Sequence, residues 1–328
     1  MKSNVSPLPS NADRVLETYL VHCRCEKRLD EKTVKAYRCD LGQFLAWTAS
    51  RQLVWSEVMK GDVSAYIAHL NGSFAPASAK RKVASVRAFY AYCEDEGLVA
   101  MTPFYGLKVS IREPKRLPRT IPLADLSRMF EQGADVARDS VYERFRHARD
   151  RAIIEVLIAT GVRVSELCGL DDQDFDPVAK TLLIFGKGAK ERIIQVESGC
   201  TLDALERYRV CRDAWLSACS AAAGVVASPE GRAALFVNRF GNRMAEQSVR
   251  AVITAIADRA SASTHITPHM FRHTFATLLL EEDVDIRYIQ RLLGHSSIKT
   301  TEIYTHVTST KLRSILRDHN PRNAIGKE

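Results

Sequence analysis

The sequence predicts a mainly helical protein with one small β-sheet, an α+β chain divided into two domains. Three observations predict this class. Apolar residues recur at three- to four-residue spacing over most of the chain, a single pair of β-rich runs interrupts them, and a basic segment containing prolines separates an early part from a later one. A chain of 328 residues is also about twice the length of a typical domain of about 150 residues.

Residues 1–110 are expected to form a helical domain. Val63, Tyr66 and Leu70 recur at helical spacing, as do apolar residues in the preceding segments. The next stretch, SAKRKVASVRAFYAYCEDEG, predicts a further helix that starts near Ser78 and ends before Gly97. The first domain therefore contains several helices and no expected strand.

Residues 111–120 are expected to be a linker. The surrounding stretch KVSIREPKRLPRTIP contains three prolines and five basic residues against one acid. Proline lacks the backbone donor that a helix needs and restricts the residue before it, so the segment should be extended. We place the domain boundary here.

Residues 121–328 are expected to form the second domain. The stretch GADVARDSVYERFRHARD is polar and is predicted to be a loop or weakly helical, whereas DRAIIEVLIATG predicts an apolar helix that ends at Gly161. The run TLLIFGKGAKERIIQV predicts a β-hairpin. Helices are expected from 202 to about 222 and from Glu246 to the end.

Positive charge is concentrated in the first third of the chain. The net charge is +8; residues 1–120 hold 19 Lys and Arg against 12 Asp and Glu, whereas residues 121–328 hold 28 against 27. A basic domain beside a nearly neutral one favours a polyanionic partner such as nucleic acid, although a solvated surface is the alternative. The candidate phosphate contacts lie on the last helix of the first domain and in the linker: Lys80, Arg81, Lys82, Arg87, Lys115, Arg116 and Arg119.

No apolar run is long enough to predict a membrane span, and the N-terminus lacks the apolar stretch of a signal peptide, so a cytoplasmic protein is expected. Its eight cysteines are then expected to be free thiols. Cys23, Cys25, Cys39 and His22 are an alternative zinc site, but their spacing differs from that of paired CxxC knuckles. No metal site is predicted.

The stretch TPHMFRH indicates an anion site near a helix start. Thr267 is the expected N-cap and Pro268 the first helical residue. His269 and Arg272 are three residues apart, so they share a face and offer two donors to an anion.

The opposite face of this helix is expected to carry an apolar stripe of Phe271, Phe275 and Leu278, with His273 beside it as a packing residue. His265, His269 and His273 also recur at four-residue steps, which leaves a metal site as an alternative. Pro268 interrupts that pattern, and no Glu or Asp stands where a zinc hydrolase needs its general base.

Six residues in order resemble the active site of the tyrosine recombinases, most closely the Xer and phage-integrase branch. They are Arg163 in ATGVRVSELCGL, Lys187 in FGKGAKER, His269 and Arg272 in TPHMFRHTFAT, His295 in LLGHSS and Tyr304 in TTEIYTHV. The resemblance implies a helical, SAM-like core-binding domain in residues 1–110 and a catalytic domain in residues 121–328. Together these domains would form a C-shaped clamp on DNA.

The resemblance also implies the chemistry. Tyr304 would be the nucleophile and would form a 3′-phosphotyrosyl intermediate, while Arg163 and Arg272 would bind the non-bridging phosphate oxygens. Lys187 would protonate the leaving 5′ oxygen, and His269 and His295 would add hydrogen bonds and assist proton movement. Such chemistry requires neither ATP nor a metal ion, so no cofactor is expected.

The implied partner is double-stranded DNA with specific recombination sites, with no membrane involved. In this family a tail such as THVTSTKLRSILRDHNPRN docks on a neighbouring subunit, which implies a homotetramer, or a heterotetramer with a paralogue, on two duplexes. Docking of the tail on its own domain is the alternative. An integrase or transposase of a mobile element, acting in the cytoplasm at the nucleoid, is the first hypothesis. A housekeeping Xer-type resolvase of chromosome or plasmid dimers and a non-catalytic DNA-binding regulator are the alternatives.

Overall fold

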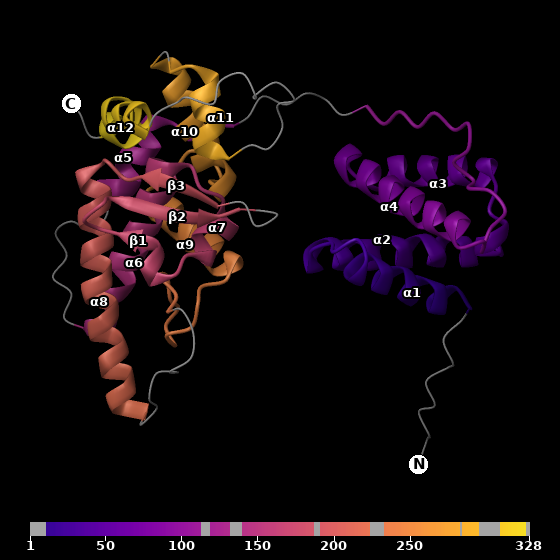
Figure 1. Ribbon diagram of the computed structural model, residues 1–328, viewed down its shortest axis with the longest axis horizontal. Coiled ribbons are helices and arrows are strands. Elements are labelled where there is room, and N and C mark those ends of the chain that lie inside the picture. Colours follow the sequence, from indigo (N-terminus) through magenta and orange to yellow (C-terminus); the bar gives the residue numbers. More distant parts are fainter. Residues whose placement is uncertain are drawn as a thin grey trace. The chain divides into compact units, whose positions relative to one another are not determined.

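The chain forms two compact units, unit 1 (residues 1–116) and unit 2 (residues 117–328), and the division falls within residues 111–120. The computed structural model describes residues 11–112, 119–131, 140–186, 191–223, 233–282, 284–294 and 309–325. Figure 1 shows helices alone in unit 1 and a small sheet among helices in unit 2. The predicted mainly helical fold with one small sheet is confirmed.

Unit 1 has its own apolar core. Leu20, Leu41, Phe44 and Val86 are among its most deeply buried side chains. Helix α4 begins at Pro76, two residues before the expected Ser78, because proline suits the first position of a helix. The elements of unit 1 are α1 (Asn11–Cys25), α2 (Glu31–Ser50), the 3₁₀ turn η1 (Trp55–Glu57), α3 (Lys60–Ser73) and α4 (Pro76–Asp95).

The sheet of unit 2 is antiparallel, with strand order β1-β2-β3. Strand β1 is Phe175–Asp176, β2 is Thr181–Phe185 and β3 is Glu191–Gln195, so the strands of the predicted hairpin are β2 and β3. Leu182 pairs with Ile194 and Ile184 pairs with Arg192, which places these four residues on the face that packs on the core. Residues 187–190, which join β2 to β3, lie outside the described part.

Helix α6 (Val141–Thr160) is longer than the sequence analysis expected. The polar stretch before Asp150 is predicted to be a loop or weakly helical; from Val141 onward it is helical, so the loop alternative is wrong there. Ser140 is the N-cap, its side chain accepts a hydrogen bond from Glu143 N at 3.0 Å, and Phe145 in the polar stretch is fully buried. A good cap and one large apolar anchor therefore extend the helix through charged sequence.

Helix α6 is the central helix of unit 2. It packs against α8 and α10, and its residues from Ala152 to Ala159 are buried on nearly every side. The other helices of this unit are α5 (Leu123–Glu131), α7 (Val164–Gly169), the 3₁₀ turn η2 (Asp172–Asp174), α8 (Gly199–Ala223), α9 (Glu246–Arg259), α10 (Pro268–Glu281), α11 (Ile286–Leu293), α12 (Ser309–Asp318) and α13 (Pro321–Ala324).

The C-terminal helices pack on their own unit. Leu316 of α12 is fully buried in the core of unit 2. Arg322 Nε donates to the buried carboxylate of Glu155 at 2.6 Å, and Asn320 Nδ2 donates to Ala159 O at 3.0 Å, so both contacts reach α6. The sequence left docking on a neighbouring subunit and docking on its own domain both open for this tail; here residues 309–325 pack on their own unit.

Candidate functional site

The end of helix α6 organises the candidate site. Gly161 ends the helix in the left-handed conformation, with φ at 62°, which glycine adopts without steric cost. A Cβ at this position would lie 2.6 Å from Phe275 Cδ1 and 2.8 Å from Leu293 Cδ2, so no larger residue fits without displacing these side chains. The close packing brings the end of α6 against α10 and α11.

Arg163 follows this turn as the N-cap residue of α7. Its backbone N–H donates to Glu166 Oε2 at 2.8 Å, and its guanidinium Nη1 donates to Glu166 Oε1 at 2.7 Å. The side chain of Arg163 remains 37% exposed, whereas that of Glu166 is 4% exposed. The buried carboxylate therefore orients an arginine that still has donors facing solvent.

Arg272 lies on α10 and is only 7% exposed. Its Nη1 donates to Gly161 O at 2.8 Å and its Nη2 donates to Leu293 O at 2.6 Å. These two carbonyls end α6 and α11, so a single planar guanidinium ties two helix C-termini together. Negative helix ends favour such a cation.

The electrostatics of these residues are strongly coupled. Burial, together with the neighbouring cation Arg163, lowers the pKa of Arg272 to about 10, so the guanidinium stays charged at neutral pH. Burial would raise the pKa of Glu166, but hydrogen bonds from Arg192 and Arg163 outweigh it and hold the pKa below its ordinary value. The site thus holds fixed positive charge around one ionised carboxylate.

The histidines of α10 are both exposed. The helix begins at Pro268 after Thr267, as predicted, and His269 lies in its first turn, open to solvent. The interpretation of His273 as a packing residue is wrong, because its side chain is exposed. Burial of part of the ring and the neighbouring His269 and Arg272 lower the pKa of His273.

The predicted apolar stripe of α10 is shifted by one position at its end. Phe271 and Phe275 are fully buried, as the stripe requires. Leu278 is only half-buried, while Leu279 is fully buried in its place. The helix therefore turns a slightly different face to the core than the spacing indicated.

Three of the six predicted catalytic residues, Lys187, His295 and Tyr304, lie outside the described residues. Described residues near Lys187 and His295 contact the arginines or their partner Glu166. Gly294, directly before His295, caps α11 with φ at 64° next to Leu293, whose carbonyl Arg272 binds. Strand β3, which follows Lys187 in the chain, contains Arg192, and this arginine binds Glu166.

The sequence analysis missed Glu166 and Arg192. Arg192 Nη1 and Nη2 donate to the two oxygens of Glu166 at 3.0 and 2.8 Å, which makes a bidentate pair between β3 and α7. The spacing Arg163-x-x-Glu166 at a helix start is the local signal that could have identified the carboxylate. No local signal indicated Arg192, because its partner lies 26 residues earlier in the chain.

The predicted phosphate contacts on α4 are not equivalent. Lys82 is buried, and its ammonium donates to Asp40 Oδ1 at 3.1 Å and to Gln43 Oε1. Arg81 is exposed but pairs with the same carboxylate, as does the hydroxyl of Ser85 at 2.9 Å. The prediction that Lys82 contacts phosphate is therefore contradicted by its burial; Lys82 joins α4 to α2 instead.

The other predicted phosphate contacts divide into exposed and undescribed residues. Lys80 and Arg87 are exposed on α4, and the guanidinium of Arg87 lies 5.1 Å from the ring centre of Phe104. Arg119 is also exposed. Lys115 and Arg116 lie outside the described residues.

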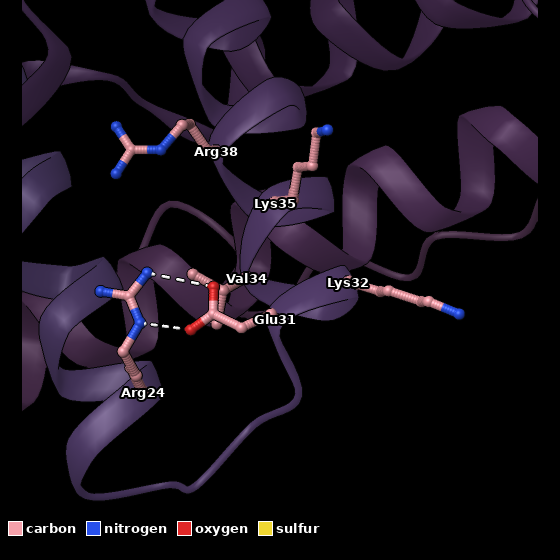
Figure 2. A pocket seen from close by; sticks show the side chains of 6 residues that line it. All are labelled: Arg24, Glu31, Lys32, Val34, Lys35 and Arg38. Carbon is pink, nitrogen blue, oxygen red and sulfur yellow. Dashed lines mark hydrogen bonds and ion pairs between the residues drawn. The ribbon is translucent and has the colours of Figure 1, made fainter. Parts of the chain in front are cut away.

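A second basic surface, which the sequence analysis missed, lines a hollow between α1 and α2. Figure 2 shows Arg24 bound to Glu31 through two hydrogen bonds of 2.6 and 3.3 Å, with Lys32 pointing away from this pair. Lys35 and Arg38 complete the basic rim, and Arg38 pairs with Glu17. The signal was present in the sequence as Lys32, Lys35 and Arg38, three basic residues at a spacing of three along the first part of α2.

No cluster of His, Cys, Asp or Glu suited to a metal ion occurs among the described residues. In unit 1, Cys23 is buried while Cys25 and Cys39 are exposed, so the alternative zinc ligands do not share one environment. Among the described helices, none is both long and apolar enough to cross a membrane.

Comparisons with known proteins find relatives over nearly the whole chain. A model of the phage integrase family matches residues 137–311, and a model of the phage integrase N-terminal SAM-like domain matches residues 16–97. A protein of Agathobacter rectalis named tyrosine recombinase is 39% identical over 317 residues, covering 95% of this chain and 98% of its own length. The tyrosine recombinase XerC of Staphylococcus saprophyticus is 32% identical, covering 94% of this chain and 98% of its own length.

Two solved structures have the same fold. The XerH site-specific recombinase bound to its difH substrate matches with a TM-score of 0.64 and 22% identity, covering 93% of this chain and 84% of its own. Lambda integrase residues 75–356 bound to DNA match with a TM-score of 0.60 and 16% identity, covering 97% and 99% of the two chains. With one family model over unit 2, another over unit 1, and relatives similar over nearly their whole length, this chain belongs to the phage integrase family of tyrosine recombinases.

Proposed function

We propose that this protein is a site-specific DNA recombinase that cuts and rejoins strands through a 3′-phosphotyrosyl intermediate on Tyr304. The observation that carries the proposal is the arrangement of two arginines around the Gly161 turn. Arg272 is fixed to Gly161 O, and Arg163, two residues later, is oriented by the buried Glu166. Both guanidinium groups are held before substrate arrives, as electrostatic catalysis requires.

The arginines suit the charge that develops during attack on a phosphodiester. The phenol oxygen of Tyr304 bonds to phosphorus, the bond from phosphorus to the 5′ oxygen breaks, and that oxygen takes up a proton. Negative charge increases on the non-bridging oxygens in between, so fixed guanidinium donors stabilise the transition state more than the ground state. The exposed part of Arg163 is the surface that would meet these oxygens.

The other roles follow from side-chain chemistry. Lys187, on the β2–β3 connection, is the proposed donor of the proton to the leaving 5′ oxygen. A phenol with an ordinary pKa near 10 needs a proton acceptor to attack at neutral pH, and His269 and His295 are the proposed groups that assist. The tyrosyl phosphodiester conserves the energy of the broken bond, so a 5′ hydroxyl can reverse the step on a partner strand.

Unit 1 supplies the proposed grip on the DNA backbone. Lys80 and Arg87 on α4 are exposed, and the hollow between α1 and α2 adds Lys35; Arg119, at the start of unit 2, is also exposed. Contacts of this kind set affinity and position but carry no base sequence by themselves. Lys115 and Arg116 remain proposed contacts from the linker.

The proposed assembly is a homotetramer, or a heterotetramer with a paralogue, on two DNA duplexes. The support comes from the fold, which is shared with a lambda integrase tetramer solved on a Holliday junction at 16% identity and a TM-score of 0.56. Exchange of α12 and α13 between subunits would require each tail to leave its own Glu155. We infer that the protein acts in the cytoplasm on nucleoid DNA.

The biological role is proposed as integrase or transposase of a mobile element. A housekeeping resolvase of chromosome or plasmid dimers is the second candidate. It is favoured by the relatives named XerC, which are similar over 94% of this chain. Mapping the DNA junctions that the protein rearranges in cells separates the two, since dimer resolution acts on one fixed chromosomal or plasmid site.

The covalent intermediate provides the direct test. A duplex nicked near the cleavage site traps the adduct, because the short cleaved fragment diffuses away and rejoining fails. The wild-type protein is expected to form a covalent DNA adduct in the presence of EDTA, and Tyr304→Phe is expected to form none. Tyr288→Phe on α11 is the matched control and should react like wild type.

Two outcomes would refute the proposed function. If the wild type binds DNA but forms no adduct on DNA recovered from its binding sites in cells, it is a regulator that has kept the fold. An adduct that survives Tyr304→Phe would place the nucleophile elsewhere.

A further inference from the structure

Arg192 occupies an unusual position for a charged side chain. It lies on β3 directly opposite Ile184, on the face of the hairpin that packs on the core. Its side chain is 16% exposed, so its long stem is buried while its guanidinium reaches the edge of the arginine site. A strand position that faces the core is ordinarily apolar, so the charge of Arg192 needs a partner there.

The guanidinium of Arg192 holds the carboxylate that orients Arg163. Both terminal nitrogens of Arg192 donate to Glu166, one to each oxygen. The same two oxygens accept from the backbone N–H and from Nη1 of Arg163. Each oxygen of Glu166 therefore binds both arginine residues, and its position depends on the planar fork of Arg192.

Arg192 also touches the segment on the opposite side of the site. A Cβ added to Gly294 would lie 3.1 Å from both Cδ and Nη1 of Arg192, so the side chain runs directly against this backbone. The preceding residue, Leu293, supplies the carbonyl that binds Arg272. After burial and Arg163, the charge of Arg192 contributes to the lowered pKa of Arg272.

We propose that Arg192 is a positioning residue for DNA cleavage: through Glu166 it fixes the orientation of Arg163 while its stem locks the β2–β3 hairpin against the end of α11. This inference rests on the proposed recombinase function and deepens it. Arg192 itself does not touch the phosphate. Its effect reaches the reaction through Arg163, which would stabilise the non-bridging oxygens.

The conservative variant Arg192→Lys tests the geometry. A lysine keeps the charge but offers one ammonium, which cannot bind both oxygens of Glu166 in the same plane. The single-turnover rate of adduct formation at saturating DNA is expected to fall about 100-fold, the order of loss that a misplacement of about 1 Å causes. The dissociation constant for DNA should stay within about twofold, because Arg192 is not a phosphate contact.

Arg209→Lys is the matched control for loss of a bidentate pair. Arg209 on α8 binds both oxygens of Asp172, at 3.1 and 2.7 Å, in the same unit but in a pair that includes no residue of the site. This variant should keep the wild-type rate while showing a thermal shift similar to that of Arg192→Lys. Equal loss of rate in both variants would show a general effect on folding and would overturn the proposal.

A substrate with a neutral scissile phosphate separates positioning of Arg163 from other effects. Replacing one non-bridging oxygen by methyl removes the charge that Arg163 would stabilise. The ratio of wild-type to Arg192→Lys rates should then shrink from about 100 to about tenfold or less. A ratio that is the same on both substrates would overturn the proposal, as would a variant as fast as wild type on ordinary DNA.

Glu166→Gln keeps the inference testable if Arg192→Lys does not fold. This variant weakens the Arg192–Glu166 pair at its acidic member, so its rate of adduct formation should also fall. Its loss of rate relative to wild type should again be smaller on the neutral substrate. In the double variant the losses should not add, since both changes break one connection. Failure of the recombinase function itself would appear differently, as the absence of any adduct with the wild-type protein.

Discussion

Unit 1 and unit 2 each contain a buried carboxylate that binds two cationic side chains, and the more buried cation differs between the two units. In unit 1, Asp40 is fully buried and binds Lys82, whose side chain is only 4% exposed and whose ammonium also binds Gln43. In unit 2, Glu166 binds Arg192 and Arg163, and Arg163 keeps donors facing solvent. Asp40 also binds Arg81, whose side chain is 48% exposed, so in both units a buried acid holds one cation in packing and leaves a second one partly open to solvent; the more buried cation is a lysine in unit 1 and an arginine in unit 2.

The deciding property is the shape of the cation. An ammonium group is compact and, once buried, all of its donors point into the protein. A guanidinium is planar with five donors, so Arg163 can give one edge to Glu166 and keep the rest. Basic residues that look alike in the sequence therefore divide into structural and ligand-binding groups only when their partners are known.

The largest effect is expected at Arg272 in unit 2. In Arg272→Lys a single ammonium cannot donate to Gly161 O and Leu293 O and still reach a phosphate, so the rate of adduct formation should fall about 1,000-fold. The measurement is single-turnover trapping on the nicked duplex, with DNA affinity as the control. A loss of only a fewfold would mean that Arg272 serves packing, as Lys82 does.

The next effect concerns stability in unit 1. Asp40→Asn leaves the ammonium of Lys82 buried without a counter-charge, and the free energy of unfolding should drop by about 3 kcal/mol. Urea denaturation monitored by tryptophan fluorescence measures the change, since Trp47 and Trp55 both lie in unit 1. Adding Lys82→Met should restore most of the stability. If it does not, the loss comes from the other interactions of Asp40 and not from the unpaired ammonium of Lys82.

The smallest effect concerns the salt dependence of DNA binding. Each of Lys80→Gln, Arg87→Gln and Lys35→Gln should reduce the slope of log affinity against log salt by about 0.9, because each removes one phosphate contact. Lys82→Met is the internal control and should leave the slope unchanged. A slope reduced by Lys82→Met but not by the other variants would reverse the assignment of buried and exposed cations on α4.

The sequence was sufficient for features that depend on local pattern. Helical periodicity, the hairpin strands and the start of α10 at Pro268 were predicted because neighbouring residues determine them. The Ser140-x-x-Glu143 cap was an equally local signal, but the polar composition of the stretch favoured a loop, so the helix start at Val141 was not predicted. In the site, the order of the motif residues predicted Arg163 and Arg272, which the structure brings to the same turn at Gly161.

Features that depend on distant partners could not be predicted. Lys82 is buried because Asp40 lies 42 residues earlier on another helix, and Arg192 acts on a carboxylate 26 residues earlier. His273 is exposed although it was predicted to lie beside the apolar stripe as a packing residue. Periodicity gives the faces of one helix, but the choice of which face is covered depends on the elements that pack against it.

The last turn of α6 acquires its hydrogen-bond partners late in the chain. Its terminal carbonyls at Ala159 and Gly161 accept from Asn320 and Arg272, which are 161 and 111 residues further on. Unfolding of this turn therefore requires that the hydrogen bonds from Asn320 and Arg272 both break. The end of α6, Arg272 and the C-terminal tail should then open and close as one cooperative unit. Release of the tail toward a neighbouring subunit would then loosen the hydrogen bond of Arg272 to Gly161 O, without any ligand bound to the tail or to the arginine.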